Sequence, residues 1–494
     1  MPTVIHILEF CPFAHNFIGK WAKGSRFPPA TTERIRFMKY LDIEFDYINK
    51  PSLEPEFIPF GVWADAYLAA ADRPFEVAVE RDNGNISVFS SFLREESYEA
   101  ANYRYMERFI KFLLWSVGGW KITICGCEET AAKLQDAYRE GGSREFDVHF
   151  ADDVFERGLL VEITDKEHFP KANEHPRPVG GHLNGCRIGF DAGGSDRKVS
   201  AVIDGTSVYS EEVEWFPKLS EDLSYQYNGI VEAFKTAASK MPRVDAIGIS
   251  SAGTFVGNSP MVCSLFIKIP RSQREEVKTI YDRAAKEIGD VPVVVANDGD
   301  VTALAGAMSL GSGSVMGIAM GTSEAAGYVD AQGRILGWYN ELAFAPVDLN
   351  EDATVDEWST DRGVGCKYFS QDAVIKLAPR AGIELDESLS LAQKLKEVQK
   401  LAEAGHEGAR EIFVNIGVYL AHTLSLYARI YDLKYLLVLG RVASGIGGDL
   451  LIEECNRILK EEYPELYDRI KVMLPDEKAR RVGQSIAAAS LPEA

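Results

Sequence analysis

The chain has 494 residues, of which 53 are basic and 74 acidic, so its formal net charge is −21. This length is enough for roughly three domains, and an acidic surface argues against a protein that coats nucleic acid. No run of about 18 apolar residues predicts a membrane span, the first residues lack a secretory signal pattern, and the seven cysteines have no disulfide-framework spacing. We therefore expect a cytoplasmic, multidomain enzyme or sensor with no nucleic-acid or membrane partner.

A change of composition between Thr164 and Cys186 predicts the first domain boundary. Three prolines and three glycines alternate there with polar residues, which is typical of a connector. We place the boundary at residue 183, so residues 1–183 form a separate module. Residues 1–180 contain 21 basic and 29 acidic side chains, and 21 − 29 = −8 argues against an N-terminal DNA-binding domain.

The N-terminal module has the pattern of a mixed α/β unit. Residues 75–79 and 86–89 alternate around Asp82-Asn83-Gly84-Asn85, which predicts a hairpin because Asn and Gly accept positive φ. A helix over 98–115 follows, then a strand, a helix and a strand over 121–126, 128–140 and 159–163. We interpret one aromatic group as core or domain interface rather than as a sugar-stacking platform: Phe109, Phe112, Trp115 and Trp120.

Strands and helices alternate in the remainder of the chain, which indicates an α/β architecture around a sheet. Strands are expected over residues 187–190, 199–204, 246–250, 291–296, 315–319 and 435–439. Helices are expected over 223–241, 272–289 and 409–431, and Ser272 with Glu275 predicts a capping box at the start of the second.

The first candidate site is the turn Asp191-Ala192-Gly193-Gly194-Ser195-Asp196, which follows the strand at 187–190. Glycines let a backbone approach a phosphate, and a neighbouring carboxylate can hold hydrated Mg²⁺. A plain glycine-containing hairpin is the alternative. No Walker A loop occurs in the chain.

The second candidate is Asn297-Asp298-Gly299-Asp300, after the apolar strand at 291–296. A carboxylate at the end of a strand can accept a proton from a substrate hydroxyl, and Asn297 offers both a donor and an acceptor. Taken alone, Asp298 as a helix cap is the favoured interpretation.

Two further turns complete the pattern. Met320-Gly321-Thr322-Ser323 suits a phosphate, although Glu324 adds a negative charge beside it. The Gly-rich stretch from Gly440 to Gly445 follows the strand at 435–439 and could lie beneath a nucleotide, with a tight strand-to-helix connection as the alternative.

The order of the four turns resembles the ASKHA superfamily of acetate and sugar kinases, Hsp70 and actin. Within it the chain resembles the ROK family of bacterial sugar kinases and sugar-responsive repressors. The resemblance covers about residues 185–492, and the stretch from Asp245 to Gly253 is similar to the strand and turn that enter the family's sugar site.

The resemblance implies two RNase H-like lobes with a cleft between them, at 184–300 and 301–494, after the module at 1–183. It implies an ATP-dependent carbohydrate kinase that binds ATP, Mg²⁺ and a sugar, with Asp298 as general base. A non-catalytic or regulatory sugar-binding protein is the alternative, and a homodimer is left open. Phosphate binding would fall to Asp191 (through hydrated Mg²⁺), Gly193, Gly194, Gly321, Thr322 and Gly440, and sugar binding to Asn297, Glu341 and Gly253.

The chain departs from the family on the sugar side. The motif Gly-Glu-x-Gly-His is Asn340-Glu341-Leu342-Ala343-Phe344, so Phe stands in place of His. Of the zinc motif only Cys366 is kept, and Tyr368 replaces a Glu, so we expect no structural zinc. A solvated face is the expected setting of one nearby acidic group: Asp352, Asp356, Glu357 and Asp361. The sequence leaves the sugar and its phosphorylated hydroxyl undefined.

Overall fold

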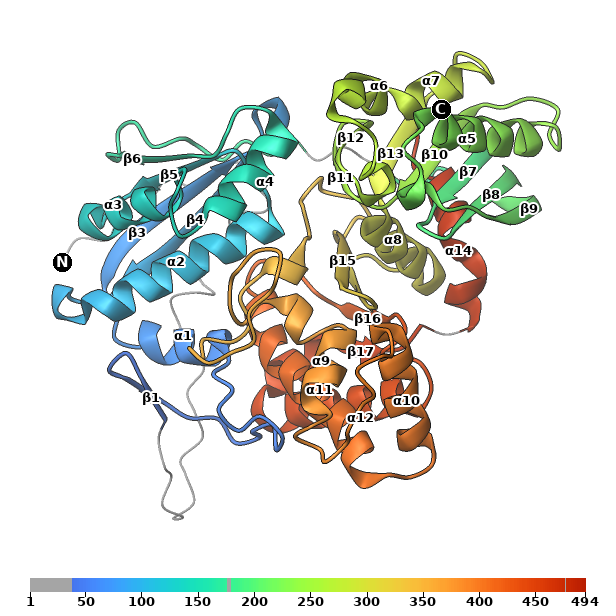
Figure 1. Cartoon of the computed structure of the whole chain (residues 1–494). Coiled ribbons are helices and arrows are strands. Elements are labelled where there is room, and N and C mark those ends of the chain that lie inside the picture. The colour runs from blue at the N-terminus through green and yellow to red at the C-terminus, as the bar shows by residue number, and fades with distance from the viewer. Residues whose placement is uncertain (1–37, 176–178, 476) are drawn as a thin grey trace.

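The computed structural model describes residues 38–175, 179–475 and 477–494. Three main sheets organise this part of the chain, one in the N-terminal module and one in each of two following lobes (Figure 1). The protein is thus an α/β protein with two lobes and an additional module, as the sequence predicted. Two short strand pairs lie outside the main sheets: β1 (Met38–Tyr40) with β2 (Ile43–Phe45), and β11 (Thr254–Val256) with β12 (Ser259–Val262).

The module has a four-stranded sheet in the order β4-β3-β5-β6. Its predicted hairpin is confirmed, because β3 and β4 are antiparallel and the turn between them uses positive φ at Asn83 (52°) and Gly84 (72°). The helix predicted over 98–115 is α2, and the helix predicted over 128–140 is α3. Two other helices, α1 and α4, were not predicted. The elements are α1 (Phe60–Leu68), β3 (Arg73–Glu80), β4 (Ile86–Leu93), α2 (Glu99–Ser116), β5 (Lys121–Cys125), α3 (Glu128–Ala137), α4 (Glu145–Phe155) and β6 (Leu160–Thr164).

The first lobe has a five-stranded sheet in the order β13-β10-β7-β8-β9. Three consecutive antiparallel strands are followed by two parallel ones, which is the expected RNase H-like arrangement. The strands are β7 (Cys186–Ala192), β8 (Asp196–Ile203), β9 (Thr206–Glu214), β10 (Ala246–Ser251) and β13 (Val293–Asn297), and α5 (Leu223–Ala238) packs on β7 and β8.

The C-terminal helix α14 (Glu477–Ala489) also packs on this first sheet. A Cβ atom at Gly189 of β7 would lie 1.6 Å from the carbonyl oxygen of Ser485, and one at Gly248 of β10 would lie 1.7 Å from that of Ala488. Glycine at both positions therefore lets α14 lie directly on the sheet. The last helix of the sequence thus returns to the first lobe (Figure 1).

The predicted helix over 272–289 is wrong in one respect, because it is broken into shorter pieces. These are a 3-10 turn (Arg271–Gln273), α6 (Arg274–Lys278) and α7 (Ile280–Lys286). The break falls at Thr279, whose hydroxyl donates to the carbonyl oxygens of Glu275 and Glu276 and competes with the helical pattern. Gln273, and not Ser272, precedes α6, and no side chain caps it. The predicted capping box is therefore also wrong.

The second lobe has a four-stranded sheet in the order β15-β14-β16-β17. The antiparallel pair β14 and β15 is followed by parallel β16 and β17. The strands are β14 (Val315–Met320), β15 (Glu324–Val329), β16 (Tyr435–Leu439) and β17 (Lys471–Met473). The helices are α8 (Asp298–Leu310), α9 (Gln371–Leu377), α10 (Leu391–Glu403), α11 (Glu407–Tyr427), α12 (Ile446–Glu462) and α13 (Pro464–Arg469).

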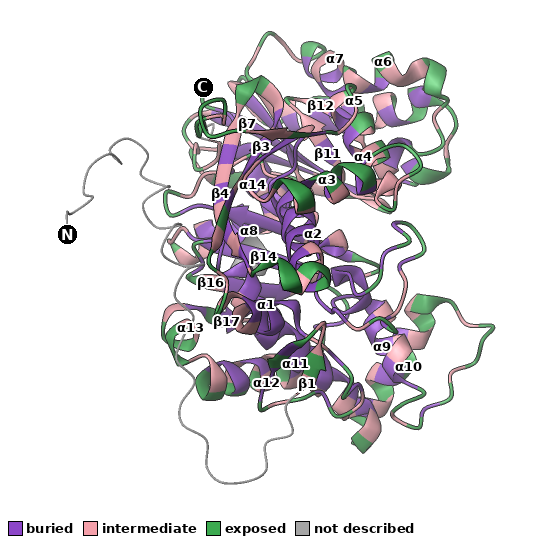
Figure 2. Ribbon diagram, turned by 90° about the vertical axis from the view of Figure 1, so that its left-hand side faces the viewer, coloured by how far each residue is buried: buried purple, intermediate pink, exposed green. Residues whose placement is uncertain are grey.

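The module and the second lobe share one hydrophobic core, whereas the first lobe has its own. Phe112 of α2 stacks on Tyr427 of α11 with ring centroids 5.9 Å apart, and the hydroxyl of Tyr419 donates to buried Glu54 at 2.6 Å. Most residues of α2 and α11 are buried (Figure 2). The module is therefore an integral part of the structure on the side of the second lobe.

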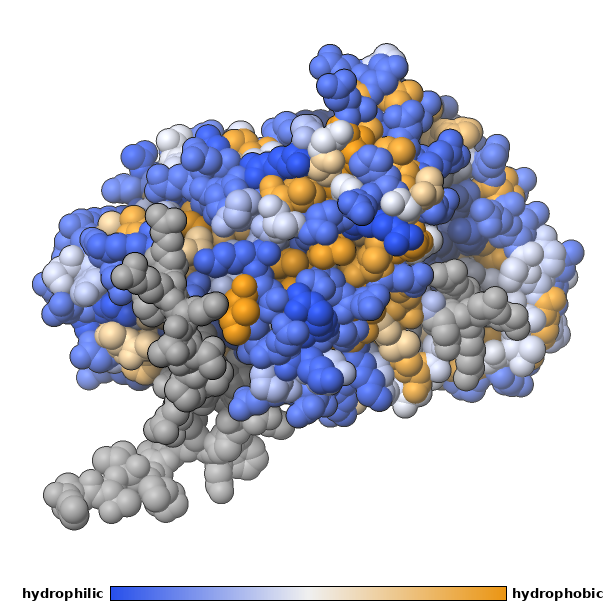
Figure 3. All heavy atoms as spheres, turned by 90° about the horizontal axis from the view of Figure 1, so that it is seen from below, coloured by the Kyte–Doolittle hydropathy of each residue, from blue (hydrophilic) through white to orange (hydrophobic). Residues whose placement is uncertain are grey.

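The outer surface is drawn by hydropathy in Figure 3. Seen from below, it is mainly hydrophilic, with hydrophobic residues in smaller groups (Figure 3). Within the described ranges, no helix combines the length and the apolar character needed to cross a membrane.

Candidate active site

The carboxyl ends of three parallel strands meet at one edge of the first sheet. Asp191 on β7 is in register with Ser250 on β10, and Ser251 is in register with Asn297 on β13. Ligands of α/β sheets bind at such ends. The register thus brings two turns that are 106 residues apart in sequence, from Asp191 to Asn297, to the same edge.

The turn after β7 places a carboxylate beside two glycines. Asp191 is 5% exposed, and its Oδ1 accepts a hydrogen bond of 2.9 Å from the hydroxyl of Ser250, which leaves Oδ2 for a hydrated cation. Burial raises the pKa of Asp191 to about 6. A Cβ at Gly193 would lie 2.6 Å from the carbonyl oxygen of Asp196, so the tight turn requires glycine. Trp215 fixes the turn from outside, because its indole N–H donates to the Gly193 carbonyl at 2.7 Å.

Asn297, and not Asp298, caps helix α8. The Asn297 side chain accepts the N–H of Gly299 at 2.7 Å and donates to the carbonyl of Gly253 at 2.8 Å. Two predicted sugar-binding residues are therefore in direct contact. Asp298 is the first residue of α8, and burial raises its pKa above the ordinary value, although the N–H of Gly299 and the charge of Lys218 act in the opposite direction. A carboxylate with a raised pKa is a suitable general base.

Lys218 is a site residue that the sequence reasoning missed. It lies in the 3-10 turn Pro217–Leu219, and its side chain covers Gly194: a Cβ there would be 2.8 Å from Cε and 3.1 Å from Nζ of the lysine. The ammonium group therefore lies beside the first glycine turn, within electrostatic reach of Asp298. A single Lys in a Pro-Lys-Leu turn carries no sequence signal that would have identified it.

The two predicted turns of the second lobe also meet. Gly440 has φ of 89°, and a Cβ there would lie 2.4 Å from the carbonyl oxygen of Met320, which precedes Gly321. The N–H of Val442 donates to the same carbonyl at 3.0 Å, and Thr322 is exposed at the end of β14. Gly321, Thr322 and Gly440 thus form one group. Among the described residues, no hydrogen bond or ion pair joins this group to Asp191 or Asp298.

Glu324 does not place its charge beside the phosphate turn. Its side chain is 4% exposed and points toward Gly365, where a Cβ would come within 2.2 Å of Oε2. Neither carboxyl oxygen has a hydrogen-bond partner. Burial raises the pKa of Glu324 to about 8, and the charge of Glu341 acts in the same direction. Glu324 is therefore mainly protonated at neutral pH.

Glu341 is linked to α8 through its neighbour Asn340. Asp300 on α8 accepts hydrogen bonds from the Asn340 side chain at 2.8 Å and from the N–H of Tyr328 at 3.1 Å. Burial raises the pKa of Glu341 to about 7, with a further contribution from the charges of Asp298 and Asp300. The structure thus brings Glu341 within electrostatic reach of Asp298, as the proposed sugar site requires.

Phe344 occupies an aromatic cluster that the module supplies. Its ring centroid lies 4.6 Å from Trp115 of α2 and 5.3 Å from Phe146 of α4. The interpretation as core or interface is confirmed for Phe109, Phe112 and Trp115 of α2, which are buried, whereas Trp120 beyond the helix is half-buried. The side chain that replaces histidine is therefore a packing residue.

The expected solvated face is confirmed for Asp352 and Glu357, which are exposed, and wrong for Asp356 and Asp361, which are buried. Asp361 is 8% exposed and forms ion pairs with Arg108 (2.9 Å), Lys111 (3.1 Å) and Arg144 (2.8 Å) of the module. Burial alone would raise the pKa of Asp361, but the charges of Arg108 and Lys111 lower it to about 2. Cys366 Sγ faces the Asp356 carboxylate at 3.4 Å. We define the interface network as Glu107, Arg108, Lys111, Arg144, Asp147 and Asp361.

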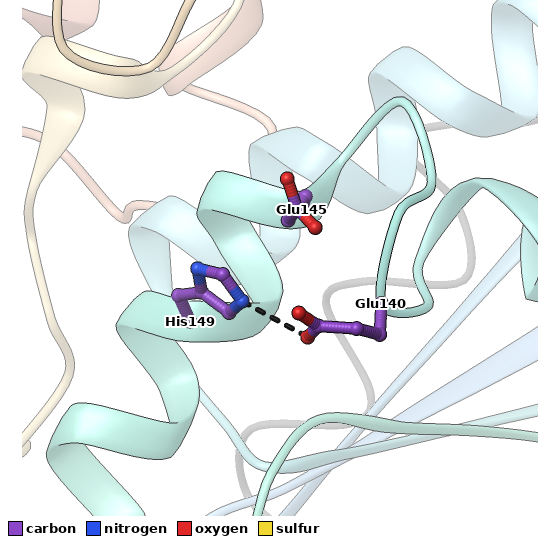
Figure 4. A group of neighbouring side chains, drawn as sticks. All are labelled: Glu140, Glu145 and His149. Atoms are coloured by element: carbon purple, nitrogen blue, oxygen red, sulfur yellow. Dashed lines mark hydrogen bonds and ion pairs between the residues drawn. The ribbon is translucent and has the colours of Figure 1, made fainter.

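An acidic group with a histidine lies on the surface of the module, at the start of α4 (Figure 4). Its members are Glu140, Glu145 and His149, whose ligand atoms lie within 4.8 Å of one another. His149 Nε2 and Glu140 are hydrogen-bonded at 2.9 Å, and both are exposed. Exposed acidic groups of this kind are common, and we assign this one no role.

No protein-family model and no curated protein matches the chain. Solved structures similar to it include the ROK hexokinase of Thermus thermophilus, 20% identical over 62% of this chain and 96% of that one, with a TM-score of 0.48. A ROK family glucokinase from Streptomyces griseus in complex with glucose and AMPPNP is 18% identical over 62% and 98% of the two chains (TM-score 0.44). A ROK family transcriptional regulator, a homologue of the E. coli MLC protein, is 17% identical over 63% and 79% (TM-score 0.48). These similarities concern the fold alone, and the observed strand order gives the chain the two-lobed α/β fold that its ROK-like motifs predicted, with an additional N-terminal module.

Proposed function

We propose that the protein transfers the γ-phosphoryl group of ATP to a hydroxyl of a sugar or sugar derivative. The observation that supports this most is the shared edge of β7, β10 and β13. Asp191 and Asn297 lie at this edge, and Asp298 directly follows Asn297, which supports the proposed roles of Asp191 in cation binding, Asn297 in hydroxyl binding and Asp298 as base. Phosphoryl transfer asks the protein mainly for positioning and charge stabilisation.

The residues of the first lobe fit a hydrated magnesium ion and a phosphate chain. Asp191 offers Oδ2, and Gly193 and Gly194 of the turn add no side chains of their own between its backbone and a ligand. Lys218 adds an ammonium group beside the turn. Magnesium would neutralise part of the phosphate charge when bound. In the second lobe, Gly321, Thr322 and Gly440 would hold the rest of the nucleotide.

The acceptor would be oriented by Asn297 and Glu341, with its hydroxyl directed at Asp298. The raised pKa of Asp298 makes this carboxylate a better proton acceptor than an ordinary Asp, so it can take the hydroxyl proton as the phosphoryl group arrives. The Asn297 side chain is held by Gly253 and Gly299, so its orientation is fixed before substrate binds. Preorganisation of this kind contributes to the rate because the groups need no rearrangement during the reaction.

A second candidate function is sugar binding without catalysis, in a regulatory role. The observation that favours it is Phe344, which fills the family's histidine position and packs on Trp115 instead of facing a ligand. Calorimetry separates the two functions, because the kinase must bind ATP with Mg²⁺ and the regulator need not.

The direct test is phosphate transfer to a panel of sugars and amino sugars. We expect sugar-stimulated ATP turnover in the wild type and a loss of about 10²- to 10⁴-fold in Asp298→Asn. Asp222→Asn is the matched control, because Asp222 caps α5 in the same lobe and Asn is an equally good cap. If no sugar stimulates turnover, or if Asp298→Asn retains it, the kinase assignment is wrong.

A further inference from the structure

We propose that the N-terminal module forms the third wall of the acceptor site, and that the acceptor extends beyond one sugar ring: a glycoside or short oligosaccharide. This inference rests on the proposed function of the site around Asp298. It assigns a task to the module, for which the sequence motifs indicated none.

A cavity of about 150 Å³ carries this inference, because all three parts of the protein line it. The first lobe contributes the segment from Gly253 to Asn258 together with Asn297. The second lobe contributes the segment from Ile335 to Tyr339, and the module contributes its hairpin turn and His175. Asn297 and Gly253, the two hydrogen-bonded residues of the candidate sugar site, are thus part of the same wall as Asn83 and Asn85 of the module. Asp298 is not among the lining residues, whereas its neighbour Asn297 is.

The module holds its wall in place through contacts to the second lobe. Nη1 of Arg81 donates to the carbonyl oxygens of Leu336 (3.4 Å) and Gly337 (3.2 Å). The N–H of Tyr339 donates to the carbonyl oxygen of Val117, directly after α2, at 3.2 Å, and the N–H of Asn340 donates to that of Ser116, the last residue of α2, at 3.0 Å. The segment that leads into Glu341 is therefore built against the module.

The module is also tied to the first lobe, through α4. Arg274 of α6 donates to the carbonyl oxygen of Asp153, and Lys278 forms an ion pair of 2.6 Å with Glu156. Phe155, near the end of α4, stacks on Tyr339 at 5.9 Å and lines the cavity. One wall of the cavity thus contacts both lobes.

Two buried polar atoms in the cavity wall lack a partner. They are Nε of Arg81, whose side chain is 3% exposed, and the hydroxyl of Tyr339. Buried donors without a partner are costly, and such groups are retained where a ligand satisfies them.

The charges of the cavity favour an uncharged ligand. The guanidinium of Arg81 is already paired with Glu174, and Asp82 and Asp300 add negative charge to the lining. The amides of Asn83 and Asn85 lie together with the rings of Phe155 and Trp338, whereas the Asn258 amide is bonded within the first lobe. Amide groups bind hydroxyls, and aromatic rings bind the apolar faces of sugar rings, so this lining fits a second sugar or another polyhydroxylated group.

Calorimetric binding of matched ligands to the full chain tests the inference. The single rings are glucose and N-acetylglucosamine, and the extended ligands are maltose, cellobiose and diacetylchitobiose. We expect at least one disaccharide to bind at least tenfold more tightly than its monosaccharide. Filling the cavity should remove that ratio. Gly257→Asn and Gly337→Asn fill the cavity from opposite lobes. Both glycines line the cavity and have open space at Cβ, and both have positive φ, which Asn tolerates.

Gly382→Asn is the matched control, because Gly382 has the same backbone geometry and open space but does not line the cavity. It should keep the disaccharide preference. Asn83→Gly tests the module alone, since it removes the amide at a residue whose φ is 52° and should also lower the preference. Equal binding of mono- and disaccharides, absence of all binding, or an unchanged ratio in both filled variants would overturn the inference. Disaccharide binding without any phosphoryl transfer would instead refute the proposed function, but it would still support the module as part of a binding site for an extended sugar.

Discussion

Two groups of buried or half-buried acids in this protein have different surroundings. The candidate active site gathers carboxyl groups whose pKa values are raised by burial: Asp191, Asp298, Asp300, Glu324 and Glu341. The interface network gathers Asp361 and its neighbours with three cations of the module, and the pKa of Asp361 falls to about 2. Asp361 and its cationic partners link the second lobe to the module, whereas burial penalises the charged form of the acids at the candidate site.

This difference separates structural from functional charge. A buried pair is strongly destabilised when one partner is removed, because the other charge is left uncompensated. An acid that is buried without a cation is costly to keep, and such groups concentrate at sites that bind or catalyse. The comparison thus predicts opposite effects on stability when acids of the two groups are neutralised.

The largest effect on stability is expected for Asp361→Asn. The change leaves Arg108, Lys111 and Arg144 with an excess of positive charge at 2%, 1% and 12% side-chain exposure, so we expect a loss of about 3–5 kcal/mol of unfolding free energy. Denaturant titration would show it as a lower midpoint. Because the folded pKa of Asp361 lies below its ordinary value, its contribution is complete above about pH 4 and is lost as the pH falls through about 2.

Asp136→Asn is the control for this prediction. Asp136 forms an exposed ion pair with Arg139, and we expect a change within about 0.5 kcal/mol. If both variants are equally stable, the interface network does not hold the module to the second lobe.

An intermediate effect is expected at the active site for Lys218→Met. Lys218 lies beside Gly194, so its removal should weaken a charged hydrogen bond to the nucleotide and raise KM for ATP by about 10- to 100-fold, which corresponds to about 1.5–3 kcal/mol. Steady-state kinetics would measure it. Lys235→Met, which removes an exposed lysine paired with Glu287, should leave KM unchanged. An unaltered KM in Lys218→Met would exclude Lys218 from nucleotide binding.

The smallest effect is expected for Glu324→Gln, and it should appear only as a pH dependence. The folded pKa of about 8 exceeds the ordinary value of 4.5, so ionisation of Glu324 lowers wild-type stability as the pH rises between these values. Melting temperatures at pH 6 and pH 8 should show that the variant becomes more stable relative to the wild type as the pH rises. The difference in unfolding free energy should change by less than about 1.4 kcal/mol per pH unit. The charge of Glu341 also raises the pKa of Glu324. Glu341 is present in both the wild type and the variant, so its own titration contributes equally to the two profiles. A parallel pH profile in both would contradict the buried, unpaired state of Glu324; exposed Glu129→Gln is the control.

Much of the fold could be predicted from local signals. The turns after β7, β13, β14 and β16 and the hairpin before β4 carry Gly, Asn or Asp at positions that need them, so the sequence alone located all of them. The break at Thr279 was not predictable, because it depends on hydrogen bonds of the Thr279 hydroxyl, whereas the residues on both sides continue one helical pattern.

The candidate site was predictable only in part. Lys218 and the cavity wall depend on which segments the folded chain brings together, and no spacing in the sequence encodes this. The ion pair between Arg108 and Asp361 joins residues 253 positions apart, so the burial of Asp361 could not be predicted from its neighbours in sequence. Local patterns predict turns well, whereas buried charge depends on partners far away in the chain.

The central claim is that Asp298 is retained for chemistry at the expense of stability. It is tested most directly by measuring phosphoryl transfer and unfolding free energy on the same preparation of Asp298→Asn. We predict that transfer falls by about 10²- to 10⁴-fold while stability at pH 8 is equal to that of the wild type or higher, because burial penalises the charged form that the variant lacks. Retained transfer, or a loss of transfer together with a loss of stability, would contradict the claim.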